Sequence, residues 1–170
     1  MSAGSDEFCK FIRDLAVSLR TMSVLEVGCS AGDNLRLFNP HARVCGVDAD
    51  ERAVQDARRK FPGWEFVQSP PTNLPYDDSS FDFVFTYTLL NRLEDCDVRK
   101  AISEMFRVSD KYVVNCELYG IDGKRCDDLR LRDVFSQWLD YRVKIISNVD
   151  MHEEIDPKKT KFTLVRKIHE

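Results

Sequence analysis

Short apolar runs of strand length alternate along the chain with longer segments whose apolar residues recur every three or four positions. The short runs predict buried strands, and the spaced segments predict amphipathic helices. The predicted strands cover 24–28, 43–48, 64–67, 81–87, 111–116, 141–149 and 161–168, and the predicted helices cover 8–19, 31–38, 51–61, 98–106 and 131–138. Strands that alternate with helices are typical of βαβ units and of a mainly parallel sheet.

The end of the chain departs from this alternation. No helical pattern separates 141–149 from 161–168, and the polar connection between them contains Asp156-Pro157. These two segments should therefore form an antiparallel hairpin, which makes the sheet mixed at one edge. Ser5 and Asp50 precede predicted helices, where their side chains can cap the helix N-terminus. We expect an α/β fold in which seven strands form a doubly wound sheet with helices on both faces.

Composition limits the class of protein. A length of 170 residues fits one domain, here 1–170, with an N-terminal helix in 1–21 and a core in 22–170. No apolar run approaches the ~20 residues that cross a bilayer, and the first residues, 1–6, are small and polar, so we expect neither a membrane span nor a targeting segment. The net charge of −4 disfavours nucleic acid as the main partner. The six cysteines form no C-x-x-C pair and no metal-ligand pattern, which favours a reducing, cytoplasmic location and no metal site.

The clearest candidate chemistry follows the first predicted strand. Gly28 and Gly32 flank a tight turn, where a missing Cβ permits positive φ or close approach of a ligand. Asp48 ends the second predicted strand 20 residues after Gly28. A carboxylate there can accept hydrogen bonds from both hydroxyls of a ribose, or it can cap the next helix, a role that Asp50 also fits. The turn and the carboxylate together predict a nucleoside pocket.

The residues of this turn separate two classes of cofactor. A dinucleotide site requires G-x-G-x-x-G, but Ser30 and Asp33 occupy the second and third glycine positions. Asp33 and Glu26 would also repel a pyrophosphate. Carboxylates suit a cationic ligand better, and S-adenosylmethionine carries an ammonium and a sulfonium.

Three segments resemble the ordered motifs of class I S-adenosylmethionine-dependent methyltransferases. They are the turn 26–32, Asp48, and the run 73–84, which contains Leu-Pro-Tyr and then Ser-Phe-Asp-Phe-Val. Within that superfamily, residues 107–114 with Glu117 and Tyr119, and then residues 131–135, are similar to small methylases associated with pseudaminic acid and related surface-sugar biosynthesis. The resemblance implies a Rossmann-like sheet of seven strands whose last strand is antiparallel, and it implies S-adenosylmethionine as the cofactor.

The resemblance also assigns roles to individual residues. The turn around the methionine part would contain Glu26, Gly28, Cys29, Ser30 and Gly32; the ribose and adenine would meet Asp48, Ala49, Ser69 and Pro70; and Thr86 with Tyr87 would border the cofactor and the substrate entrance. Relatives usually carry an acidic residue for the adenine amino group near Ser69, and a histidine near Arg92. This chain has neither, so Ser69 or a backbone carbonyl would have to replace the acid.

The acceptor side of the site is predicted from the end of the fifth strand. Glu117 and Tyr119 are candidate catalytic bases or substrate contacts, and Arg92 could hold an anionic acceptor through its fork of donors. We therefore expect methyl transfer to a small molecule, a carbohydrate or sugar-derived acceptor, by a monomer or homodimer.

Two other functions stay open at this point. The first is a degenerate protein that keeps the cofactor pocket and serves as partner or regulator of another enzyme, which the missing acid and histidine would explain. The second is a nicotinamide oxidoreductase, which requires tight binding of NAD.

Overall fold

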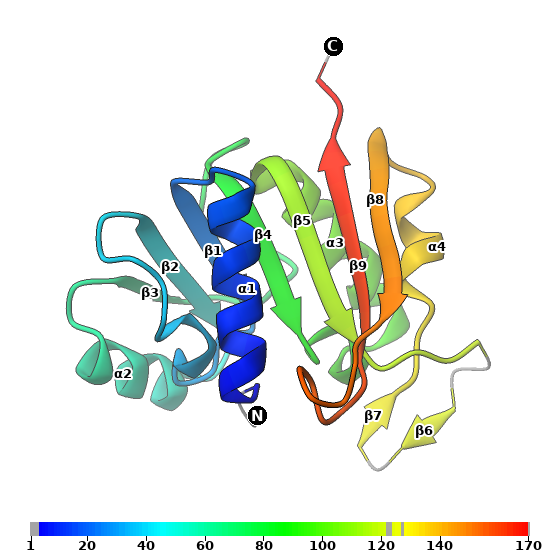
Figure 1. The fold of residues 1–170 in the computed structure, drawn as a ribbon, viewed down its shortest axis with the longest axis horizontal. Coiled ribbons are helices and arrows are strands. Elements are labelled where there is room, and N and C mark those ends of the chain that lie inside the picture. Colours follow the sequence, from blue (N-terminus) through cyan, green and yellow to red (C-terminus); the bar gives the residue numbers. More distant parts are fainter. Residues whose placement is uncertain (1–3, 122–123, 127, 170) are drawn as a thin grey trace.

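A seven-stranded sheet organises the computed structural model, which describes residues 4–121, 124–126 and 128–169 (Figure 1). Its strands are β1 (Ser23–Val27), β2 (Arg43–Asp48), β3 (Glu65–Gln68), β4 (Phe81–Tyr87), β5 (Ser109–Glu117), β8 (Val143–Asp150) and β9 (Lys161–Lys167). The order across the sheet is β3-β2-β1-β4-β5-β9-β8. Strands β1 to β5 pair in parallel, whereas β9 is antiparallel to both β5 and β8. The predicted mixed sheet and its terminal hairpin are thus confirmed.

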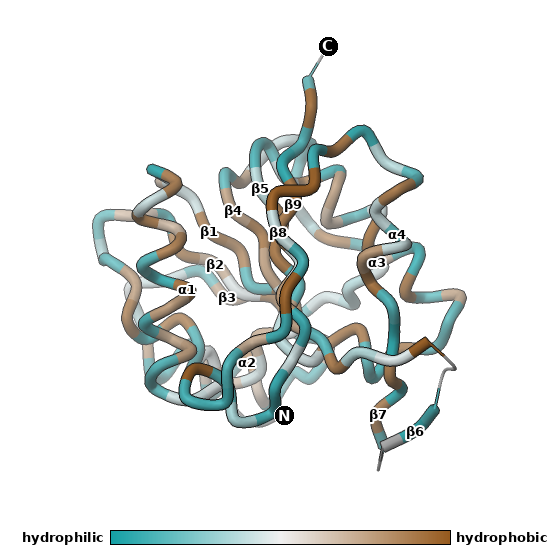
Figure 2. Tube along the Cα trace, turned by 45° about the vertical axis from the view of Figure 1, so that its right-hand side comes forward, coloured by the Kyte–Doolittle hydropathy of each residue, from teal (hydrophilic) through white to brown (hydrophobic). Residues whose placement is uncertain are grey.

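Helices cover both faces of the sheet, as predicted. They are α1 (Asp6–Ser18), α2 (Glu51–Lys60), α3 (Asp95–Val108) and α4 (Val134–Trp138). Helices α1 and α2 contribute side chains to one core cluster, and α3 and α4 contribute to the other. In Figure 2 the hydrophobic colour follows β1 and β4, which both clusters enclose. Within the described part of the chain, no helix is long and apolar enough to span a membrane.

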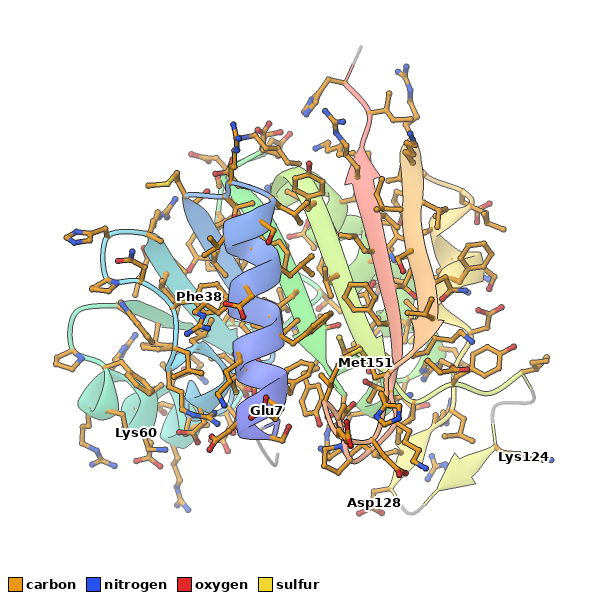
Figure 3. The ribbon with its side chains drawn as sticks, viewed as in Figure 1. Glu7, Phe38, Lys60, Lys124, Asp128 and Met151 are labelled. Atoms are coloured by element: carbon orange, nitrogen blue, oxygen red, sulfur yellow. The ribbon has the colours of Figure 1, made fainter. Side chains whose placement is uncertain are left out.

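Helix α1 begins and packs as its sequence predicts. Ser5 Oγ accepts a hydrogen bond from Phe8 N (3.1 Å), which caps the helix. Phe8 and Ile12 are fully buried against the sheet, a contribution of roughly 1.5–3 kcal/mol for each side chain. Figure 3 places Phe38 and Met151 on either side of α1, and both belong to the same core cluster.

The helix predicted over 31–38 is wrong, because only the single 3-10 turn η1 (Asp33–Leu35) forms there. Gly32 adopts left-handed φ (79°) immediately before it, which interrupts any helix that begins at residue 31. The side chain of Asn34 also hydrogen-bonds outside the segment, to Glu26 and to Gly4. Polar side chains with tertiary partners of this kind compete with regular helix.

The helix predicted over 131–138 is too long. Asp133 caps α4, so the helix starts at Val134, and the N–H groups of Leu131 and Arg132 instead donate to Lys124 O and Leu118 O. The structure also contains a second, two-stranded sheet that was not predicted, formed by β6 (Arg125–Cys126) and β7 (Leu129–Arg130). The shorter helix thus follows from its cap at Asp133, and the second sheet is a short local hairpin.

The parallel strands direct their carboxyl ends to one edge of the sheet, the lower edge in Figure 1. The connection from β8 to β9 returns at the same edge, next to the N-terminus of α1. Ser5 Oγ donates to Ile155 O in this connection (2.6 Å). In open α/β sheets, ligands bind outside these carboxyl ends.

Candidate functional site

The turn after β1 lies at this carboxyl edge and contains three residues with positive φ. They are Gly28 (80°), Ser30 (48°) and Gly32 (79°). Gly28 donates its N–H to Val47 O (2.8 Å), which ties the turn to the end of β2. A Cβ added at Gly28 would lie 2.8 Å from Leu89 Cδ1, so the turn also packs closely against the segment that follows β4. The ends of β1, β2 and β4 therefore meet at this turn.

Asp48 connects the end of β2 to the turn. Its Oδ2 accepts from Ser30 N (2.8 Å) and its Oδ1 accepts from Asp50 N (2.9 Å). The cap of α2 is Asp50, which accepts from Arg52 N (2.9 Å), so Asp48 does not serve as the helix cap. A carboxylate has about four lone-pair sites. Two of those on Asp48 are used by these hydrogen bonds, and no further donor to it is found among the described residues.

Glu26 places a second carboxyl group at the turn, and this group is fully buried. Asn34 Nδ2 donates to its Oε1 (2.6 Å), while Oε2 is buried and has no hydrogen-bond partner among the described residues. Burial raises the pKa of Glu26 well above its ordinary value. A ligand ammonium next to Oε2 would lower that pKa and satisfy the acceptor. The chemistry of this site therefore fits the cationic cofactor inferred from the sequence.

Thr88 is a site feature that the sequence analysis missed. It follows β4, and its hydroxyl is buried without a partner among the described residues. Its φ is 52°, which is unusual for a β-branched residue. Strain of this kind is concentrated at functional sites. The residues around Thr88 in the sequence do not predict its positive φ, because this strain depends on how the end of β4 packs.

The residues expected near the adenine lie together with Asp48. Ala49 follows Asp48 directly, and Ser69 donates its N–H to Asp48 O (2.9 Å) at the end of β3. The hydroxyl of Ser69 donates to Asn73 O (2.6 Å), which leaves its lone pairs available as acceptors. Pro70 is exposed beside it, and its carbonyl accepts from Asn73 N (3.2 Å).

The side chain of Cys29 points away from the turn. It is buried in the core, and a Cβ added at Gly46 would lie 2.8 Å from its Sγ. Burial raises the pKa of this thiol far above its ordinary value. Cys29 can therefore contribute only backbone atoms to a ligand site.

Thr86 and Glu117 form a buried network on the other side of β4. Glu117 Oε1 accepts from Thr86 Oγ1 (2.8 Å) and from Leu89 N (3.2 Å), and its Oε2 accepts from Asn91 N (3.2 Å). Asn91 Oδ1 in turn accepts from Leu118 N (2.7 Å). Burial raises the pKa of Glu117 to about 7. Glu117 thus holds the turn η2 (Leu90–Arg92) against the end of β5.

Tyr87 links the end of β4 to the β8–β9 connection. Its hydroxyl donates to Asp156 Oδ1 (2.8 Å), and its ring centroid lies 4.3 Å from that of Phe8. Asp156 also accepts from Lys158 N (3.1 Å), Thr160 N (3.1 Å) and Thr160 Oγ1 (2.5 Å). This fully buried carboxylate therefore fixes the connection beside the site.

Polar side chains form the outer rim of the site. Arg92 is exposed at the end of η2, and Tyr119 is exposed just after β5 with Lys161 Nζ 4.4 Å from its ring centroid. Lys158, which was not predicted, places its Nζ 4.6 Å from the ring centroid of Tyr87. Arg92 and Tyr119 thus lie at the rim, whereas Glu117 lies beneath it.

Comparisons with known proteins agree with this geometry. A family model described as a methyltransferase domain matches residues 24–111. A probable S-adenosylmethionine-dependent methyltransferase of Mycobacterium tuberculosis is 37% identical over 82 residues, which cover 48% of this chain and 30% of that protein. A ubiquinone/menaquinone biosynthesis C-methyltransferase of Campylobacter jejuni is 27% identical over 101 residues, which cover 54% of this chain and 42% of that protein. The match thus spans less than half the length of these curated relatives.

Solved structures show the same fold. The N-methyltransferase NodS of Bradyrhizobium japonicum, in complex with S-adenosyl-L-homocysteine, matches with a TM-score of 0.77 and 18% identity, covering 94% of this chain and 86% of that chain. The YcgJ protein of Bacillus subtilis matches with a TM-score of 0.77 and 15% identity, covering 98% of this chain and all of that chain.

The family match covers more than half of the chain and includes β1 to β4, the turn 26–32 and Asp48. The strand order and the two carboxyl groups at that turn agree with this match. On these grounds the chain belongs to the methyltransferase domain family.

Proposed function

We propose that this chain transfers a methyl group from S-adenosylmethionine to a small polar acceptor derived from a carbohydrate. The observation that carries the proposal is the pair of carboxyl groups beside the glycine turn. Asp48 keeps two acceptor positions free, and Glu26 keeps a buried oxygen without a partner among the described residues. Membership of the family and the cofactor product bound in NodS support the same cofactor.

Different residues of the site contact different parts of the cofactor in this proposal. In our proposal Asp48 holds the ribose hydroxyls, the backbone of Gly28 to Gly32 passes the methionine part, and Glu26 faces the ammonium. Ser69 and Pro70 border the adenine, where the hydroxyl of Ser69 accepts in place of the acid that relatives carry. When bound, S-adenosylmethionine supplies an electrophilic methyl group on a sulfonium.

The main contribution of the protein to catalysis would be to hold the acceptor in line with the methyl group, because such positioning can lower the activation barrier by roughly 7–11 kcal/mol. We assign the acceptor to the rim formed by Arg92, Tyr119 and the end of β4. Both oxygens of Glu117 accept from protein donors, although its pKa of about 7 would suit a base. We therefore propose that Glu117 positions the turn that bears Arg92.

The carbohydrate part of the proposal has two supports. Residues 107–114 with Glu117 and Tyr119, and residues 131–135, resemble small surface-sugar methylases. The rim side chains are polar or charged, which suits a hydrophilic acceptor better than the apolar ring of a quinone.

Turnover separates this proposal from the two alternatives. The purified chain is mixed with S-adenosylmethionine and small-molecule extract fractions, and formation of S-adenosylhomocysteine is measured by mass spectrometry. We expect tight binding of S-adenosylhomocysteine by calorimetry and acceptor-dependent turnover. Binding without turnover in any fraction would favour a non-catalytic partner, and binding of NAD in place of S-adenosylhomocysteine would favour an oxidoreductase.

A further inference from the structure

Two cationic side chains approach the end of β4 from different segments. Arg92 is the last residue of η2, the turn that follows β4, and Lys158 of the β8–β9 connection places its Nζ over the ring of Tyr87, the last residue of β4. Figure 1 shows this connection, coloured orange to red, beside the tips of β4 and β5. Both cations therefore lie at the carboxyl edge of the sheet, next to the site assigned to the acceptor.

The backbone of each cation is fixed. Glu117 accepts from the N–H groups of Leu89 and Asn91, which sets the turn that carries Arg92. Asp156 accepts from Lys158 N (3.1 Å) and from Tyr87 Oη (2.8 Å), which sets Lys158 beside the last residue of β4. Lys158 Nζ therefore lies beside the last residue of β4, and Arg92 lies on the turn that follows the same strand.

Neither cation has an ion-pair partner within the described residues. Two described carboxyl groups, those of Asp156 and Glu117, interact with the charge of Lys158. Both accept hydrogen bonds from other donors, and neither lies within ion-pair distance of the Lys158 ammonium. The neighbouring Lys159, in contrast, pairs with Glu153 at 2.6 Å. An unpaired cation pair is unfavourable, and an anion placed between the two would relieve the repulsion.

The electrostatics of Lys158 agree with this geometry. Its pKa is lowered, mainly because the ammonium is partly buried and with a further contribution from the charge of Arg92, despite the opposing attraction of Asp156 and Glu117. Asp156 and Glu117, which already accept hydrogen bonds from other donors, thus do not fully neutralise the positive charge of Lys158.

We propose that Arg92 and Lys158 together bind an anionic group of the acceptor, either a carboxylate or a phosphate. The inference rests on the proposed function and narrows its substrate to an acidic small molecule. Arg92 would contact either anion with two parallel N–H donors, while Lys158 would act as a point charge. The methyl-accepting atom would lie on the part of the molecule nearer the glycine turn.

Binding of the bare anions tests the proposal. Amide chemical shifts of the ¹⁵N-labelled chain are followed during titration with inorganic phosphate and, separately, with acetate at constant ionic strength. We expect the shifts to concentrate in 87–92 and 156–161. Tighter binding of phosphate or of acetate identifies which anion the site prefers, and binding of neither anion there would overturn the proposal.

Variants make the test specific. Lys158→Met and Arg92→Gln should each weaken binding of the preferred anion by about tenfold or more, since each variant loses a charge-assisted hydrogen bond to it. Lys158→Arg should restore binding to within about threefold, and Lys159→Met is the matched control that should change nothing. Equal affinity in wild type and in both charge-removing variants would refute the assignment.

Calorimetry with S-adenosylhomocysteine on the same samples separates this proposal from the proposed function. The four variants should bind it like wild type. If wild type failed to bind S-adenosylhomocysteine, the proposed cofactor would be wrong, while the anion titration would still decide whether Arg92 and Lys158 form an anion site.

Discussion

Replacement of Asp156 by alanine should strongly destabilise the protein, because this buried carboxylate accepts four hydrogen bonds. In Asp156→Ala, the hydroxyl of Tyr87 and the N–H and hydroxyl of Thr160 lose their acceptor. Each buried donor left unpaired costs about 1–3 kcal/mol, and partial access of water reduces the sum. We therefore expect the free energy of unfolding to fall by about 3–5 kcal/mol, a large part of the roughly 5–15 kcal/mol typical of a domain.

Urea unfolding followed by circular dichroism measures this change. Glu153→Ala is the matched control in the same connection, since its ion pair with Lys159 is exposed and should contribute less than about 1 kcal/mol. Asp156→Asn keeps one acceptor oxygen and serves if the alanine variant does not fold. A loss below about 1 kcal/mol in Asp156→Ala would refute the reasoning.

A double-mutant cycle locates the effect. Tyr87→Phe removes only the donor to Asp156. The summed losses of stability in the two single variants should therefore exceed the loss in the double variant by about 1–3 kcal/mol. Additive losses would mean that the hydrogen bond does not couple the two residues.

Three further predictions concern the site. Asp48→Asn should weaken binding of S-adenosylhomocysteine, measured by calorimetry, by about tenfold or more. The control variant Asp50→Asn keeps a good helix cap and should leave this affinity unchanged. Equal affinities in the two variants would exclude the ribose contact. Gly28→Ala should lower the free energy of unfolding by at least about 1 kcal/mol, because φ is 80° and the new Cβ would lie 2.8 Å from a Leu89 carbon. The control is Gly63→Ala, where a Cβ meets nothing within 4 Å. Equal unfolding midpoints for the two variants would contradict the strain argument. The pKa of Glu117 is raised from 4.5 to about 7, so the folded chain binds more protons than the unfolded chain between these values. The stability of wild type relative to Glu117→Gln should accordingly fall by about 3 kcal/mol as pH rises through this window, and a difference independent of pH would disprove the shift.

The sequence predicted those features that depend on local pattern. The alternation of apolar runs placed β4 at the bounds that the structure shows, and the position of Asp48 at the end of a strand was enough to place it at the glycine turn. The helix expected over 31–38 failed because Gly32 takes left-handed φ, a choice that depends on how the turn packs.

The remaining parts of the site depend on long-range contacts. Glu117 was correctly placed at the end of β5, but its partners are backbone amides of Leu89 and Asn91, more than 25 positions away. Lys158 lies in a connection that resembles an ordinary polar turn, and long-range contacts such as that between Asp156 and Tyr87 bring it to the site. No spacing rule encodes such contacts.

The position of β9 between β5 and β8 has a consequence for biosynthesis. Strand β8 leaves the ribosome before β9, which is its partner in the sheet. Until β9 emerges, β8 is therefore unpaired, and it carries Ile146 and Val149, which are about half exposed even in the folded chain. The free edge of β5 waits as well. Unpaired edges invite association with other chains, so the interval before β9 inserts is the period when a nascent chain most needs protection from aggregation.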